Sequence, residues 1–409
     1  MKIQMKTKLD RSAKSLMACD LTNNIINLFG ETFLVAYFLQ ISNENIIQVS
    51  TFYIILYLIL GVGSILLGNI IKSKPKKRVS IYRFGIIIKS IYILLIILFK
   101  NKISHYFIIF AIFYGIAEAL YWSTHDVMNI QIVDNENRKK YMTTKRILSK
   151  FINILVPIIL GTSIELTSFG NIAIYIFVLT LFQIIMSLQI DTNKFVINDK
   201  IQKYSLKDYT TYLSNEQKEN INKVYELAFL YGIMMDTIRV LVVVITIMTF
   251  KTSFNFGILT TIFSVFSMIA LYLFNKLYQK KYAKRLLLFC ATLVVLGVLG
   301  LILNINKTTL IIYNFTYSIT VYILEVMFKI KADDIVKENN IEKWLVEYHT
   351  FTEGFMEIGR ITGFILMLLV GLLNNVIYFK LLLLIVTISI PIYARIMYKL
   401  EKSVVKNNA

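Results

Sequence analysis

The sequence contains few of the residues that stiffen a chain, cross-link it or bind metals. Its 409 residues include three prolines, two cysteines and three histidines. Cys19 and Cys290 lie inside apolar stretches and no CxxC pair occurs, so neither a disulfide framework nor zinc or redox chemistry is expected. The histidines are widely separated and lack metal-ligand spacing. We therefore predict no cofactor and no metal.

The motifs of nucleotide-driven and hydrolytic proteins are also missing. The sequence has no P-loop, no GxGxxG, no HExxH and no GxSxG. Without a phosphate-cradling loop, ATP-driven transport by this chain alone is not expected. Without a nucleophile–base or metal cluster, we predict that the protein is not an enzyme.

Long apolar runs fill most of the chain. Hydrophobic residues make up 56% of it, and a helix needs about 20 residues to cross a bilayer. Each run is predicted to be a helix, because an open strand cannot satisfy its backbone in lipid. The twelve predicted spans cover residues 14–40, 46–71, 80–99, 103–131, 143–165, 169–190, 222–249, 252–275, 286–305, 308–330, 348–373 and 375–398.

Acidic residues are outnumbered: 25 Asp and Glu stand against 44 Lys and Arg, a net charge of +19. The basic residues cluster in the N-terminal tail and after the second, fourth and eighth spans, at 2–14, 72–78, 138–146 and 276–285. The positive-inside rule explains this excess better than nucleic-acid binding does. We predict a multi-pass membrane protein, in contact with the lipid bilayer, with both termini in the cytoplasm.

The spans divide into two groups of six. Residues 107–133 align without a gap with residues 310–336. Parallel six-helix repeats are typical of transporters whose site lies between the repeats. We predict an all-α polytopic membrane protein with two pseudo-symmetric six-helix bundles, 1–190 and 222–409. The central cytoplasmic loop, 191–221, is interpreted as a solvated linker, with a helix on the membrane surface as the alternative.

The connection after the second span carries a short motif, a glycine followed by a basic run. Its residues are Gly68, Lys76, Lys77 and Arg78. With twelve spans, a long central loop and internal termini, the chain resembles the major facilitator superfamily over essentially its full length. The resemblance implies that these four residues belong to a loop that takes part in conformational change.

Two positions of this motif differ from the family pattern. The family has an acidic residue four positions after the glycine, which helps to latch the cytoplasmic faces of the two halves. Lys72 stands at that position here, and Pro75 stands where the family has a second glycine. The resemblance alone therefore does not imply this latch for this chain.

Polar residues interrupt the first span at helical spacing. Asp20, Asn24, Asn27 and Glu31 are separated by four, three and four residues, which places them on one stripe. Because a charge inside a bilayer is costly, such residues normally face the bundle interior or water. We interpret the stripe as a polar wall with titratable carboxylates. An interhelical hydrogen-bond ladder is the alternative for the asparagines.

The fourth span contains a second group. Glu118, Tyr121, Trp122 and His125 stand at i, i+3, i+4 and i+7. A carboxylate and an imidazole at this spacing suit a proton relay, and the two aromatic rings could stack on a sugar or an aromatic ring. The alternative is that His125 lies near the cytoplasmic interface, where polar groups are ordinary.

Two later spans carry oppositely charged neighbours. Asp236 and Arg239 stand at i and i+3 in the seventh span, and the eleventh contains Glu353, Glu357 and Arg360 at i, i+4 and i+7. These groups either neutralise one another or exchange partners when protonated, which would couple an ion to a substrate. The two arginines are predicted substrate contacts.

Together these features predict a secondary active transporter that moves a small solute by alternating access. A proton is the expected coupling ion, with sodium as the alternative, and Asp20, Glu118 and Asp236 are the candidate proton sites. Lys89 in the third span is a weaker candidate, because that helix often faces lipid or its neighbouring helices. A glycolipid or amphiphile flippase and a non-transporting scaffold remain the alternatives. We expect a monomer in a bacterial cytoplasmic membrane, since the composition resembles that of low-GC bacterial transporters.

Overall fold

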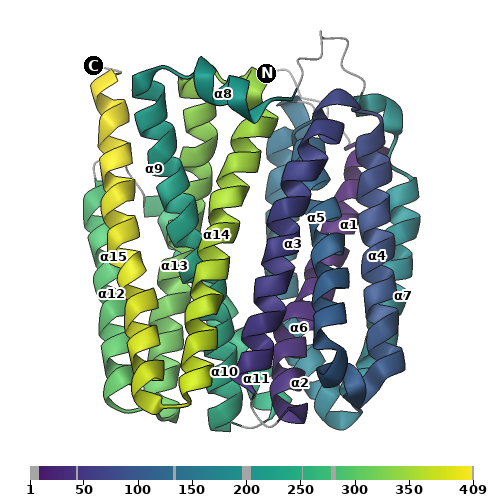
Figure 1. The fold of residues 1–409 in the computed structure, drawn as a ribbon, viewed down its shortest axis with the longest axis vertical. Helices are drawn as coiled ribbons and strands as arrows, with labels where there is room; N and C mark the ends of the chain where they lie inside the picture. Colours follow the sequence, from purple (N-terminus) through teal and green to yellow (C-terminus); the bar gives the residue numbers. More distant parts are fainter. Residues whose placement is uncertain are drawn as a thin grey trace, which may run out of the picture.

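The structure is a computed structural model that describes residues 9–42, 45–131, 135–195, 204–250, 252–277 and 282–407. Within these ranges the regular elements are all helices and there is no strand. Twelve helical spans are long and apolar enough to cross a membrane, which confirms the predicted all-α multi-pass fold. The first helix, α1, begins and the last helix, α15, ends at the same end of the bundle, which we call the termini side (Figure 1).

The first six spans form one bundle, the N-half. Its first span is a helix with a π-helical turn, η1, between two α-helical parts. The elements are α1 (Arg11–Asn27), η1 (Leu28–Phe33), α2 (Leu34–Ile41), α3 (Ile46–Ser73), α4 (Lys77–Phe99), η2 (Lys100–Tyr106), α5 (Phe107–Gln131), α6 (Asn135–Leu166), α7 (Phe169–Leu188) and η3 (Thr192–Phe195).

The remaining spans form the C-half, and its first span is interrupted in the same way, by η4. The elements are α8 (Leu206–Tyr212), α9 (Asn215–Gly232), η4 (Ile233–Thr237), α10 (Ile238–Phe250), α11 (Ser253–Leu277), α12 (Ala283–Leu303), α13 (Lys307–Glu338), η6 (Glu342–Trp344), α14 (Leu345–Leu373) and α15 (Val376–Asn407).

Capping residues set the helix boundaries that hydropathy missed. The Asp10 side chain accepts a backbone N–H bond of 2.7 Å, so α1 starts three residues before the predicted span. Ser214 and Gln217 form a capping box that starts α9 at Asn215, inside the predicted loop 191–221. Charged residues in that first turn of α9 conceal its start from an argument based on apolar length.

The two π-helical turns occupy equivalent places in the two halves. The shift of 205 residues that relates Leu28 to Ile233, where the turns begin, also relates Glu31 to Asp236. A π turn adds one residue to an α-helix and is frequent at functional sites. The structure therefore extends the internal repeat to the first span of each half, and it makes these two acids counterparts.

The halves meet along two pairs of helices. α3 packs along α14 and α6 packs along α11; the first pair lies in the middle of Figure 1. Tyr53 of α3 stacks on Phe364 of α14 with ring centroids 4.7 Å apart. At the second pair, a Cβ added to Gly257 would lie 2.5 Å from the carbonyl oxygen of Pro157. Glycine is thus required for this close approach.

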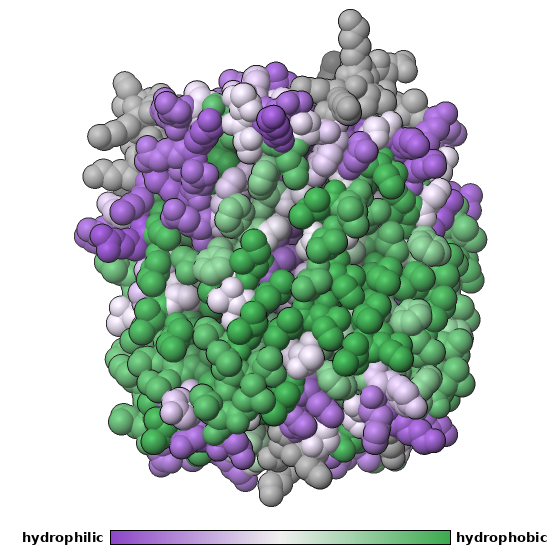
Figure 2. Space-filling view, viewed as in Figure 1, coloured by the Kyte–Doolittle hydropathy of each residue, from purple (hydrophilic) through white to green (hydrophobic). Residues whose placement is uncertain are grey.

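The outer surface is apolar around the middle and polar at both ends. Figure 2 shows a broad hydrophobic belt with hydrophilic residues above and below it. Large apolar side chains such as Leu66, Tyr175 and Leu303 are more than half exposed. Apolar surface of this extent requires a lipid environment. The chain is therefore an integral membrane protein.

The described part of the central loop packs on the C-half at the termini side. Tyr209 of α8 is fully buried, and its hydroxyl lies 3.0 Å from that of Tyr225. Its ring lies against Trp344 and Phe351, with centroids 6.0 and 5.8 Å away. Burial raises the pKa of Tyr209 to about 12. Within the predicted loop, residues 206–212 thus form a helix that packs on the C-half; Lys200 and Lys203 of that loop lie outside the described residues.

Candidate functional site

Charged side chains gather inside the bundle in three adjoining groups. The inter-half network joins the two halves and consists of Glu31, Asp236, Arg239, Glu357 and Arg360. The Lys89 cluster lies within the N-half and consists of Asn23, Asn27, Lys89 and Glu118. The Asp20 cluster, also within the N-half, consists of Asp20, His125, Asp126 and Lys145.

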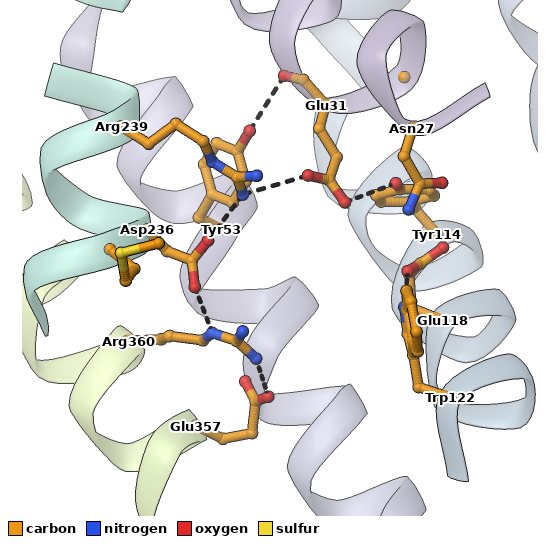
Figure 3. A network of polar contacts seen from close by, with 12 residues as sticks. Asn27, Glu31, Tyr53, Tyr114, Glu118, Trp122, Asp236, Arg239, Glu357 and Arg360 are labelled. Carbon is orange, nitrogen blue, oxygen red and sulfur yellow. Dashed lines mark hydrogen bonds and ion pairs between the residues drawn. The ribbon is translucent and has the colours of Figure 1, made fainter. Parts of the chain in front are cut away.

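Arg239 forms the ion pair that links the two halves in this network. Its Nη2 lies 2.7 Å from Asp236 Oδ1 in its own span and 3.1 Å from Glu31 Oε2 in the N-half. Figure 3 shows the guanidinium between these two carboxylates. A charge-assisted hydrogen bond is roughly twice as strong as a neutral one. One cation thus holds the two counterpart acids of the internal repeat.

Arg360 of α14 extends the network within the C-half. Its Nε lies 2.5 Å from Asp236 Oδ2, and its Nη1 forms an ion pair with Glu357. The guanidinium also lies over the ring of Tyr57 of α3, 4.9 Å from the centroid. Asp236 therefore has an arginine on each oxygen, so both predicted self-neutralising pairs form but are joined into one network.

Tyrosines hold the two π turns in place. A π turn widens the helix, and hydroxyl groups from neighbouring spans donate to backbone carbonyls within it. Tyr53 donates to the carbonyl of Glu31 at 3.1 Å, and Tyr317 donates to that of Met234 at 3.1 Å. Tyr114 donates to Glu31 Oε1 at 2.9 Å. These bonds fix the Glu31 carboxylate toward Arg239.

Lys89 of α4 is the residue that the sequence argument undervalued. It is fully buried, not lipid-facing. It pairs with Glu118 and donates to Asn23 Oδ1 at 2.7 Å and Asn27 Oδ1 at 3.0 Å. A buried lysine needs such partners because an unpaired charge in the interior is strongly destabilising. A lysine in the middle of an apolar span is itself a sequence signal for a buried carboxylate partner.

The Asp20 cluster surrounds one histidine with two acids. His125 Nε2 lies 2.7 Å from Asp20 Oδ1, and its Nδ1 lies 2.9 Å from Asp126 Oδ1. Both contacts are satisfied together when both ring nitrogens carry protons. Lys145 of α6 pairs with the other oxygen of Asp20, and Tyr121 donates to Asp20 Oδ1 at 3.1 Å.

The predicted stripe of the first span is divided by the π turn. Asp20 and Asn27 face partners inside the N-half, whereas Glu31, within the turn, faces the C-half. Asn24 Nδ2 donates to Ser149 Oγ at 3.0 Å, as the hydrogen-bond ladder predicts. Tyr121 is buried inside the N-half. Glu353 forms no hydrogen bond or ion pair with another of the described residues.

A further ion pair joins the two halves at the termini side. Lys72 of α3 pairs with Glu347 of α14, and the same carboxylate oxygen accepts a 3.2 Å bond from the backbone N–H of Ser205. Lys72 also lies over the ring of Trp344, 4.9 Å from its centroid. The pair joins the two halves and the start of α8.

The residues of the loop motif lie in different environments: Gly68 packs against the central loop, Arg78 is buried, and the two lysines are exposed. A Cβ on Gly68 would lie 2.7 Å from the ring of Tyr204, so Gly68 makes room for the central loop. Arg78 is buried and donates to the carbonyl of Ile71 at 2.7 Å and to Gln131 Oε1 at 2.5 Å. Lys76 and Lys77 are exposed.

Residues 16–328 match the family model described as Major Facilitator Superfamily. The chain belongs to this superfamily. The chain is also similar to the uncharacterized protein YqgE of Bacillus subtilis (strain 168), with 22% identity over 302 residues. That match covers 73% of this chain and 69% of the relative.

Solved structures share the fold of this superfamily member. A bacterial homologue of the iron transporter ferroportin, in an inward-facing state, has a TM-score of 0.69 and 13% identity, with 97% of this chain and 100% of that chain covered. The nucleoside transporter NupG has a TM-score of 0.70 and 12% identity, with 95% and 99% covered. At such identities the likeness shows the fold alone, which is that of a membrane transporter.

Proposed function

We propose that this superfamily member is a proton-coupled secondary transporter that moves a small solute across a bacterial cytoplasmic membrane by alternating access. The observation that carries the proposal is the position of Arg239 between Glu31 of the N-half and Asp236 of the C-half. The positive-inside rule supports a cytoplasmic termini side. A transporter is favoured over an enzyme or a scaffold because neither of these needs a charge network that spans the two halves.

Arg239 can act as a switch because its two acids are counterparts in the internal repeat. With both acids ionised, Arg239 ties the halves together through Glu31. A proton on Glu31 removes that tie and leaves Arg239 paired with Asp236 within one span. Since leaving a buried charge without a partner is costly, proton binding and separation of the halves at this point are expected to occur together.

The two clusters of the N-half support further proton sites. Glu118 and Asp20 each hold a cation, Lys89 and Lys145 respectively, that must find another partner when the acid is protonated. Asn23 and Asn27 already contact Lys89 and can retain it. Lys89 would therefore keep two hydrogen-bond partners if Glu118 were protonated.

The solute is proposed to bind beside the inter-half network. The Arg239 side chain is 42% exposed although its network is largely buried, so it can contact a ligand between the halves. The structural neighbours' names refer to iron and to nucleosides. Metal ions and nucleosides are therefore the first solutes to test, and neither is indicated by the fold alone.

Proteoliposomes with an imposed pH gradient test this proposal. Each solute is added outside while internal pH is followed with a fluorescent dye and labelled solute is counted. We expect one solute to evoke proton movement in the wild type. Glu31→Gln, Asp20→Asn and Glu118→Gln should lose gradient-driven accumulation but keep counterflow exchange.

The control is Glu219→Gln, because Glu219 belongs to an exposed ion pair of α9. It should behave as the wild type. Full pH-dependent accumulation in Glu31→Gln and Glu118→Gln, or solute uptake without any proton movement in the wild type, would contradict the proposal.

A further inference from the structure

Trp122 of α5 is the exposed member of an otherwise buried group. Its side chain is 37% exposed. It contacts Glu118 and His125 directly, and Lys89 lies next to it through Glu118. Each of these three residues is less than 5% exposed. Among these four residues, the indole ring is therefore the part that is open to a ligand.

The exposed face of Trp122 points toward the C-half and not toward lipid. Ile112 and Ile116 belong to the exposed apolar face of α5, and around the helix Trp122 lies about 80° from Ile112 and about 120° from Ile116. Asp126, one turn after Trp122 on the same face, interacts electrostatically with Lys329 of the C-half. The indole thus borders the space between the halves.

Two contacts connect this ring to the buried acids. Its Nε1 donates to Glu118 Oε2 at 2.6 Å, while the other oxygen of Glu118 pairs with Lys89. The ring also meets His125 edge to face, with centroids 5.2 Å apart and planes at 83°. Trp122 therefore touches one acid of the Lys89 cluster and the histidine of the Asp20 cluster.

We propose that Trp122 is a positioning residue that links solute occupancy to Glu118. A planar or cationic group of the solute stacks on the open indole face, as such groups do on tryptophan. Movement of the ring on stacking weakens the N–H bond to Glu118, so the Glu118–Lys89 pair can open. This inference deepens the proposed function and rests on it for the solute.

Tryptophan fluorescence tests the link without a known solute. The chain has two tryptophans, so Trp344→Phe leaves Trp122 as the only emitter. We expect the emission of Trp122 to shift when Glu118→Gln is added, because the acceptor of its N–H bond loses its charge. The same shift should appear in Lys89→Met with Glu118→Gln, which keeps the site free of charge should the single variant unfold. Identical emission with and without Glu118 overturns the link.

A quenching experiment tests the orientation. Acrylamide should quench Trp122, and brominated lipids in nanodiscs should not. The matched control is Ile116→Trp in a Trp122→Phe, Trp344→Phe background, which places the emitter on the exposed apolar face of the same helix and should be quenched by the brominated lipids. Equal quenching by lipid at both positions overturns the assignment.

The transport readout uses Trp122→Phe, which keeps a ring but removes the N–H donor. Proton-driven uptake should fall about tenfold more than counterflow does, the change that corresponds to a lost bond of about 1.5 kcal/mol. Unchanged pH dependence of uptake overturns the positioning role. If no solute moves in the wild type or in any variant, the proposed function is contradicted. The fluorescence experiment needs no solute, so it tests the link between Trp122 and Glu118 independently.

Discussion

Lys72 Nζ lies 2.5 Å from Glu347 Oε1, and this buried pair joins α3 of the N-half to α14 of the C-half. Lys72 occupies the place where the superfamily pattern has an acid. Although the family's acid is missing, a charge pair is present at this end, with the base on the N-half and the acid on the C-half. The acid lies in the first turn of α14, where the helix dipole favours a negative charge.

Charge reversal tests this pair. Lys72→Glu and Glu347→Lys should each lower the free energy of unfolding by about 3–5 kcal/mol, because each leaves like charges buried together. The combined swap should recover most of the loss, less about 0.3–1 kcal/mol for a base at a helix start. Thermal denaturation in one detergent measures the set. Glu219→Lys, which breaks the ion pair of the exposed Glu219 with Lys223, should leave the unfolding midpoint essentially unchanged. A swap no better than either single change would show that the pair does not contribute.

Lys89 and Glu118 allow structure and function to be separated. Lys89→Met alone leaves Glu118 buried without its cation and should destabilise the protein by about 3–5 kcal/mol. Lys89→Met with Glu118→Met replaces the whole pair by apolar side chains, a change that is often neutral or stabilising. The double variant should therefore fold like the wild type and fail in proton-driven transport. Wild-type pH dependence of transport in that variant would assign the pair a purely structural role.

Two glycines of α14 form a matched pair. A Cβ at Gly359 would collide with the backbone carbonyl of Phe229 in α9, whereas one at Gly354 would meet nothing within 4 Å. Gly359→Ala should lower the free energy of unfolding by about 1–3 kcal/mol or more. Gly354→Ala should leave it unchanged or raise it by up to about 1 kcal/mol, since alanine is the better helix former. Equal midpoints of thermal unfolding for the two variants would rule out tight α9–α14 packing.

Removal of the shared cation should make stability depend on pH. In Arg239→Gln, Glu31 and Asp236 lose their common partner and repel each other when both are ionised. Protonation relieves the repulsion, so the melting temperature of this variant should rise from neutral to mildly acidic pH relative to wild type. Adding Glu31→Gln should abolish the dependence, because Asp236 keeps Arg360. A flat difference between variant and wild type across that range would exclude a close approach of these acids.

The architecture could be predicted because its signals are local. The lengths of the apolar runs predicted the twelve spans. Only the helix ends were predicted wrongly, where the first turn is charged, as in α9. The inter-half network was predictable in part: helical spacing indicated the Asp236–Arg239 and Glu357–Arg360 pairs correctly. Their union through Arg360 and Asp236 depends on the distance between η4 and α14, which spacing along one helix does not report.

Other features of the site needed the structure because they arise between spans. The sequence made Lys89 only a weak candidate, because its partners Asn23, Asn27 and Glu118 come from two other spans. Glu31 was placed on one stripe with Asp20, because 3.6-residue periodicity assumes an uninterrupted α-helix. The π turn breaks that assumption, and no residue type in 28–33 announces it.

The extra residue in η1 has a consequence for mutation by deletion. Removing one residue from 28–33 would restore ordinary α-helical register, turning everything before it by about 100° and sliding it by about 1.5 Å relative to α2. Asp20 and Asn27 would then swing off His125 and Lys89 even though no contacting side chain had been altered. Deletion of one residue there should destabilise the protein more than most substitutions in the span. A continuous α-helix could keep either the contacts of Asp20 and Asn27 within the N-half or the contact of Glu31 with the C-half, but not both.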